Sequence, residues 1–314
     1  MKIPTLLLTS AALALGAATA FAEIAVIEAG ALSKIIAPDA KVEKVAGGMK
    51  FTEGPVWFGS GAEAKLIFSD IPANELKAWS QAGGLTVFRE GSNNANGNTL
   101  DLQGRLVTAE HSGRRISVTE KDGTVKTVAD QYDGKKLNSP NDVVVKSDGT
   151  FWFTDPPYGL PRGSEGKEQE GNYVFRHDPK TGQTTIVSKE HDMPNGLAFS
   201  PDEKLLYVAD SGKPRAIRAY EVKEDGTLSE GKVFCEIDKG GPDGIRVDVA
   251  GNVWSSSGDG AQIFSPDGTR IGRVILPEGG ANLCFGGADG TTLFVTARTS
   301  LYSVPTKTRD GAKR

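Results

Sequence analysis

A pattern of two apolar runs separated by a polar turn recurs along the chain. In one copy the run LAFS is followed by the turn PDEK and then by LLYVAD, and this pattern predicts a β-hairpin. Six copies occur, over residues 52–70, 95–111, 140–155, 194–210, 242–257 and 281–297. Their starts lie roughly 40–55 residues apart, which is a period typical of repeat architectures.

Third and fourth strands are predicted after most copies, for example in NELKAWSQAGGLTVFRE and RRISVTEKDGTVKTVAD. Four-stranded units at this period predict an all-β fold, a six-bladed β-propeller with blades of about four antiparallel strands. The last copy is followed only by SLYSVP, so the N-terminal segment KVEKVA (41–46) is predicted to complete its sheet. Such closure removes the open edges of the ring. We therefore expect a single propeller domain over residues 23–314.

The first 22 residues have the features of a secretory signal peptide. Lys2 precedes the apolar stretch LLLTSAALALGAATA, and small residues surround a predicted cleavage site after Ala22. An uncleaved anchor is the alternative, and no later segment has the ~20 apolar residues of a membrane span. The expected location is periplasmic or secreted.

Charge and cysteine content limit the possible partners. The formal net charge is −4 and no basic run is present, which argues against nucleic acid or an anionic membrane as a partner. The only cysteines, Cys235 and Cys284, lie in strand-like runs, which favours buried thiols over a disulfide. A monomer or a small homo-oligomer is expected.

Each hairpin copy has a polar residue at its second place. The first strand of a propeller blade lines the central channel, so these positions should converge near the axis at one end of the ring. They are Glu53, Asn96, Asn141, Asn195, Asp243 and Asn282. Carboxylate and amide oxygens favour Ca²⁺, with Mg²⁺, Mn²⁺ or Zn²⁺ as alternatives, and two carboxylates would neutralise a dication. The alternative is that these residues are turn formers that begin strands.

Residues that follow the second strands should surround the same end of the channel. They are Asp70, Glu110, His111, Asp155, Asp210, Asp259 and Arg298, and most of the Asp residues are interpreted as loop caps. The long connection 156–171, which includes Tyr158, is predicted to be a lid or specificity loop. His111 is predicted to move protons or to hold substrate. The alternative for His111 is a surface histidine hydrogen-bonded to an acidic neighbour.

Four motifs carry a resemblance to a known family: FTEGPVWF, LNSPNDVVVKSDGTFWFTDPPYG, PNGLAFSPDEKLLYVADS and GPDGIRVD. With them the chain resembles the senescence marker protein/gluconolactonase family, which includes regucalcin and bacterial lactonases, and FTDPPYG is similar to bacterial gluconolactonases. The resemblance implies a six-bladed propeller with a divalent cation, usually Ca²⁺, in the channel. It implies Glu53, Asn195 and Asp243 as metal ligands and Asn141 as a ligand or substrate contact. Asn96 and Asn282 are left with supporting or substrate-facing roles.

The chain departs from regucalcin-like members at one position, where Ser139 stands in place of an Arg that recognises sugar acids. Candidates to replace that Arg are Arg114, Arg298, His111 and the 156–171 loop.

The predicted function is divalent-metal-dependent hydrolysis of a sugar lactone such as glucono-1,5-lactone. The cation would polarise the carbonyl, Asp243 would activate water, and His111 or a metal-bound water would protonate the leaving alkoxide. The predicted substrate contacts are Asn96, Asn141, His111 and Tyr158. A hydrolase of phosphotriesters or phosphofluoridates on the same metal site is one alternative. A non-catalytic propeller that binds Ca²⁺ or another ligand is the second.

Overall fold

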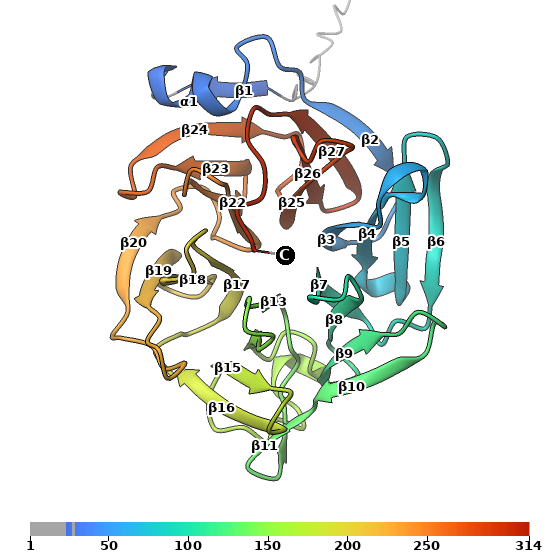
Figure 1. Cartoon of the computed structure of the whole chain (residues 1–314), viewed down its shortest axis with the longest axis vertical. Helices are drawn as coiled ribbons and strands as arrows, with labels where there is room; N and C mark the ends of the chain where they lie inside the picture. The colour runs from blue at the N-terminus through green and yellow to red at the C-terminus, as the bar shows by residue number, and fades with distance from the viewer. Residues whose placement is uncertain (1–22, 27–28, 314) are drawn as a thin grey trace, which may run out of the picture.

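Six antiparallel sheets, five of them four-stranded and one five-stranded, surround a central axis in the computed structural model (Figure 1). The structure describes residues 23–26 and 29–313, so the predicted signal peptide lies outside the described residues. Blade 1 consists of β3 (Thr52–Phe58), β4 (Lys65–Asp70), β5 (Glu75–Ser80) and β6 (Gly84–Glu90). Blade 2 consists of β7 (Ala95–Leu100), β8 (Leu106–Glu110), β9 (Arg115–Thr119) and β10 (Val125–Ala129). Blade 3 consists of β13 (Val143–Val145), β14 (Phe151–Asp155), β15 (Tyr173–Asp178) and β16 (Gln183–Ser188). Blade 4 consists of β17 (Pro194–Phe199), β18 (Leu205–Asp210), β19 (Ala216–Glu221) and β20 (Lys232–Glu236). Blade 5 contains β21 (Ile245–Val247), β22 (Val253–Ser257), β23 (Gly260–Phe264) and β24 (Arg270–Ile275). Blade 6 consists of β25 (Asn282–Gly286), β26 (Thr292–Ala297), β27 (Ser300–Pro305) and β2 (Glu43–Gly47). The predicted six-bladed propeller is confirmed.

The turns inside the hairpins explain why the repeat is readable in the sequence. In blade 3 the turn ends at Gly149, whose φ of +88° is unfavourable for a residue with a side chain. The preceding Asp148 accepts a hydrogen bond from the backbone N–H of Thr150 at 2.9 Å. Short turns of this kind fix the register of β13 and β14, in which Val143 pairs with Phe153.

The ring closes through the N-terminal segment, as predicted. Strand β2 pairs antiparallel with β27, with Glu43 opposite Ser303, and begins two residues later than the predicted segment 41–46. A further strand, β1 (Glu23–Val26), pairs with β24 and extends blade 5 to five strands. A small hairpin of β11 (Gln131–Tyr132) and β12 (Lys135–Lys136) lies outside the blades.

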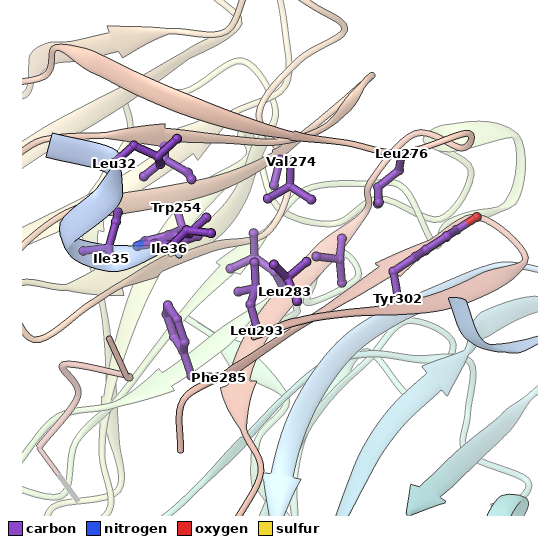
Figure 2. Close-up of a cluster of buried hydrophobic side chains, with 14 of the residues drawn as sticks. Leu32, Ile35, Ile36, Trp254, Val274, Leu276, Leu283, Phe285, Leu293 and Tyr302 are labelled. Atoms are coloured by element: carbon purple, nitrogen blue, oxygen red, sulfur yellow. The ribbon is translucent and has the colours of Figure 1, made fainter. Parts of the chain in front are cut away.

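The helix α1 (Ala29–Ile35) adds to the hydrophobic core between blades 5 and 6. Leu32, Ile35 and Ile36 are at most 5% exposed and pack with Trp254 and Val274 (Figure 2). Leu32 lies so close to β24 that a Cβ on Gly272 would be 2.7 Å from Leu32 Cδ1. This contact fastens the N-terminal segment to the propeller.

Two further predictions concern cysteines and membrane spans. Cys235 and Cys284 are buried in β20 and β25 and no disulfide joins them, as the sequence predicts. Within the described part of the chain, no helix is long and apolar enough to span a membrane.

The C-terminal segment covers one end of the channel. Its end lies at the ring axis in Figure 1, and Gly311 donates its backbone N–H to the carbonyl of Val247 at 2.9 Å. Asp310 and Ala312 line a small cavity of about 40 Å³ together with the last residues of the first strands of several blades. The first residues of those strands therefore face the opposite end of the channel.

Candidate functional site

The six predicted channel residues lie at equivalent places in the six blades. Four of them are the first or second residue of β3, β7, β17 and β25, and Asn141 and Asp243 stand two residues before β13 and β21. All except the half-buried Asp243 are at most 4% exposed. The structure thus brings the predicted set to one end of the axis.

Hydrogen bonds join these positions from blade to blade around the whole ring. Backbone N–H groups donate from Gly97 to the Asn141 carbonyl at 2.8 Å and from Gly196 to the Asp243 carbonyl at 3.0 Å. The remaining junctions are made by Ser69 Oγ to Asn96 O (2.7 Å), Thr154 Oγ1 to Asn195 O (2.6 Å), Gly244 N to Ala281 O (2.8 Å) and Asn282 Nδ2 to Glu53 Oε2 (3.1 Å). Each polar residue is therefore positioned by its neighbours on both sides.

The glycines that follow the polar residues make this approach possible. A Cβ at Gly196 would lie 2.3 Å from the Asp243 carbonyl oxygen, and a Cβ at Gly54 would lie 2.0 Å from that of Asn96. Only a residue without a side chain allows adjacent blades to come so close. The recurring Asn-Gly, Asp-Gly and Glu-Gly pairs in the sequence carry this signal, and sequence reasoning used only their first members.

Unpartnered oxygens identify the chemistry of the ring. Asn96 Oδ1, Asn195 Oδ1 and Asp243 Oδ1 are buried and have no hydrogen-bond partner among the described residues. Buried polar atoms nearly always have partners, so three such oxygens on one ring indicate a ligand. Amide and carboxylate oxygens fit a hard cation such as Ca²⁺. Over residues 23–26 and 29–313, no three His, Cys, Asp and Glu side chains are clustered as a metal site, so a cation here depends on amide oxygens as well.

The carboxylates of the ring are buried close to one another. Burial raises the pKa of Glu53 to about 7, against the hydrogen bonds from Gly54 and Asn282. Burial and the negative charges of Glu53 and Asp142 raise the pKa of Asp243 well above its usual range. A bound cation would offset this repulsion.

Two channel residues, Asp142 and Arg246, were not predicted. Asp142 follows Asn141 directly and is fully buried, and Arg246 lies in β21 with 6% exposure. A signal for both was present in the sequence, because each is a charged residue next to apolar strand residues. Asp142 stands in NDVVV and Arg246 stands in GIRV.

His111 lies beside the ring. Its Nε2 is 3.0 Å from Asn96 Nδ2, and because an amide nitrogen only donates, the imidazole accepts this hydrogen bond. Burial lowers the pKa of His111 to about 4, so the imidazole is neutral near pH 7. The alternative of a surface histidine bound to an acidic neighbour is wrong, since His111 is 7% exposed.

The predicted lid loop is fixed over the site by Ser139. The Ser139 hydroxyl donates to the Pro156 carbonyl at 2.7 Å and accepts from the Gly159 N–H at 2.9 Å. A Cβ at Gly159 would lie 2.4 Å from His111 Cβ, so the loop contacts His111 directly. Tyr158 is 43% exposed, and partial burial together with the Asp243 charge raises its pKa to about 12, against the effect of the nearby Ser211 and Asn195 side chains. Tyr158 therefore lies over the Asn195 and Asp243 side of the ring.

The residues suggested as replacements for the family Arg have different roles. Arg114 donates to the Leu137 carbonyl at 2.6 Å and to the Gly166 carbonyl at 3.1 Å, and it thereby anchors the loop. Arg298 is exposed and lines a cavity of about 360 Å³ together with Asp243, Ser211 and Phe51. Arg298 and Arg215 are thus the two cationic side chains that line the open space beside the ring.

Most acidic residues at the ends of the second strands cap backbone groups. Asp70 accepts from the N–H groups of Lys50 and Phe51 at 3.1 Å, and Asp210 accepts from Met193 at 2.9 Å. Asp155 accepts from the Asn138 N–H at 2.7 Å. These contacts confirm the interpretation of Asp70, Asp155 and Asp210 as loop caps, whereas Glu110 binds Arg115 at 2.7 Å.

Comparison with known proteins places this geometry in a family. Residues 51–299 match the family model described as SMP-30/Gluconolactonase/LRE-like region. A gluconolactonase of Zymomonas mobilis is 34% identical over 304 residues, covering 88% of this chain and 84% of that protein. The structure of a gluconolactonase of Xanthomonas campestris is 35% identical with a TM-score of 0.83, covering 90% of this chain and 94% of that one.

A more distant structure shares the fold. Regucalcin of Agrobacterium tumefaciens, described as a calcium-binding protein, is 22% identical with a TM-score of 0.69 and covers 84% of this chain and 95% of its own. The family model and the two nearly full-length relatives carry the conclusion: this chain belongs to the SMP-30/gluconolactonase/LRE-like family.

Proposed function

We propose that this protein is a lactonase that hydrolyses a sugar lactone at the ring of six polar residues on the propeller axis. The observation that carries the proposal is the set of unpartnered oxygens of Asn96, Asn195 and Asp243 at the mouth of the channel. The gluconolactonases of Zymomonas mobilis and Xanthomonas campestris, which are similar over nearly their whole length, support this substrate class. The cavity of about 360 Å³ beside Asp243 is within the size range of small-molecule sites.

Glu53, Asn141, Asn195 and Asp243 are the residues that would hold a cation, and their all-oxygen donor set favours Ca²⁺ over Mg²⁺, Mn²⁺ or Zn²⁺. When bound, such a cation polarises a carbonyl group and stabilises negative charge on its oxygen. The buried, closely spaced carboxylates of Glu53 and Asp243 fit this role, because without a cation their charges repel.

Asp243 is the proposed general base. It is half-buried and borders the cavity, and its second carboxylate oxygen, beside the Oδ1 that is offered to a cation, can accept a proton from water. The water oxygen then bonds to the carbonyl carbon of the lactone. The C–O bond of the lactone ring breaks, and the released alkoxide takes up a proton from Asp243 or through His111. Asn96, Asn141 and Tyr158 are the proposed substrate contacts, and the loop that contains Tyr158 is anchored by Ser139.

The decisive experiment is a substrate panel with and without chelator. It contains glucono-1,5-lactone, other sugar lactones, an aromatic lactone and a phosphotriester, and compares the wild type with Asp243→Asn and Glu53→Gln. We expect chelator-sensitive turnover of sugar lactones and a loss of about 10²-fold or more in both variants. Phosphotriester turnover alone would favour the phosphoester hydrolase. Metal binding without turnover of any member would favour the binding protein.

We also propose that the chain is exported and cleaved after Ala22. The charged start, the apolar stretch and the small residues at the predicted cleavage site support this. Mass spectrometry of the protein from a periplasmic extract should give an N-terminus at Glu23. A mature protein that retains residues 1–22 would contradict cleavage.

A further inference from the structure

A buried pair of opposite charges crosses the channel beside the candidate cation site. Arg246 Nη1 lies 3.7 Å from Asp142 Oδ2, and the two side chains are 7% and 0% exposed. Asp142 precedes β13 of blade 3 and Arg246 lies in β21 of blade 5. These blades are not neighbours in the ring, so the contact spans the axis and does not belong to one sheet.

Asp142 and Arg246 form an ion pair with a long separation of 3.7 Å between the charged atoms. Asp142 Oδ1 accepts from the Val143 N–H at 2.9 Å, whereas Oδ2 has no hydrogen-bond partner among the residues that the structure describes. Arg246 Nη1 donates to the carbonyl of Ile245 at 2.7 Å. The Asp142 charge is therefore only partly compensated, although a lone buried carboxylate is costly.

Asp142 acts on the ring through its charge. It repels both Glu53 and Asp243, while Arg246 attracts Glu53. When a bound cation keeps all four groups ionised, three negative charges and one positive charge give the side chains a net charge of −2 on the axis. This is the charge that one dication neutralises.

We propose that Asp142 and Arg246 form a counter-charge pair that sets the cation affinity of the ring without contributing a ligand. Asp142 strengthens the attraction for a cation, and Arg246 limits it to the charge of a dication and stabilises the channel when the cation is absent. Both are positioning residues. This inference rests on the cation site of the proposed function.

The test is calorimetric titration of the chelator-treated, full-length mature protein with CaCl₂. At an effective dielectric constant of about 20, one unit charge several ångströms from a dication changes the affinity by roughly tenfold or more. Arg246→Met makes the axis more negative and should lower the Kd for Ca²⁺ by about tenfold or more. Asp142→Asn should raise the Kd by a similar factor. The double variant restores the net charge and should return the Kd to within a few-fold of wild type.

A matched control and a second readout separate this effect from a general one. Lys126→Met removes the same charge from an exposed position on β10 and should leave the Kd unchanged. In chelator, thermal denaturation of Arg246→Met should occur at a lower temperature than in wild type, and the double variant should recover the midpoint, because its Asp142 charge is also removed. If Arg246→Met does not fold, the Kd for Ca²⁺ can still be compared between Asp142→Asn and the double variant.

The outcomes distinguish this inference from the proposed function. If the wild type binds Ca²⁺ and Asp142→Asn and the double variant share its Kd, the counter-charge role is overturned while the cation site stands. If the wild type binds none of Ca²⁺, Mg²⁺, Mn²⁺ and Zn²⁺, both the site and the pair's role are overturned. A Kd that rises in Asp142→Asn and recovers in the double variant supports the proposal.

Discussion

Replacing Ser139 with Ala tests whether this residue fixes the loop over the site. The Ser139 side chain is fully buried and makes two hydrogen bonds, at 2.7 Å to the Pro156 carbonyl and at 2.9 Å from the Gly159 N–H. The substitution removes the hydroxyl and leaves both backbone groups without this partner. The loop should then hold Tyr158 less firmly over the ring.

The magnitude follows from these two hydrogen bonds. Each contributes about 0.5–1.5 kcal/mol net, so the free energy of unfolding should fall by about 1–3 kcal/mol. For a domain of this size that corresponds to a decrease in Tm of roughly 2–6 °C. The loop also positions a proposed substrate contact, so KM for the lactone should rise by about threefold or more while kcat changes less.

The assay combines thermal denaturation with steady-state lactone kinetics. Ser164→Ala is the matched control, because it is the same substitution at an exposed position of the same loop. It should leave Tm and KM within error of the wild type. A Ser139→Ala variant with the Tm and KM of the control would refute the idea that this hydroxyl anchors the loop.

Further predictions concern the core, the pH dependence and His111. Leu32→Ala should destabilise the protein by about 2–5 kcal/mol in urea titration, because Leu32 is 3% exposed and packs against β24. Lys34→Ala, at an exposed position of α1, should leave the stability unchanged. Equal urea midpoints for the two variants would show that α1 is not part of the core. Burial raises the pKa of Asp155 to about 7, so the folded state retains a proton that the unfolded state releases, and stability should fall as pH rises from about 4 to about 7. Asp155→Asn should flatten this slope in denaturation midpoints. Asp210→Asn should alter only the acid side of the pH–stability curve. The nearby His191 and the hydrogen bonds from the N–H groups of Met193, Asp192 and Gly212 outweigh burial and lower the pKa of Asp210 to about 2. Stability from Asp210 is present above about pH 4 and is lost as pH falls toward 2. His111→Ala should lower kcat/KM about tenfold or more and change the pH–rate profile. A profile of unchanged shape would leave His111 only the role of orienting Asn96.

The sequence alone determined the propeller, the ring-closing strand and the six channel positions. These features depend on short-range signals, namely alternating apolar residues, turn residues and a polar residue repeated at one place in each hairpin. Once the repeat number is known, the symmetry of the ring brings Glu53, Asn195 and Asp243 to one end of the axis without further information.

Only the tertiary structure decided which side chains contact one another across blades. Asp142 faces Arg246, His111 accepts from Asn96, and Ser139 holds the loop that contains Tyr158. The four-residue β1 is likewise too short to show a period, and its pairing with β24 becomes visible only when blade 5 is in place. Such contacts join residues far apart in the chain. They depend on the distances and angles between packed sheets, and no local pattern of residues encodes these.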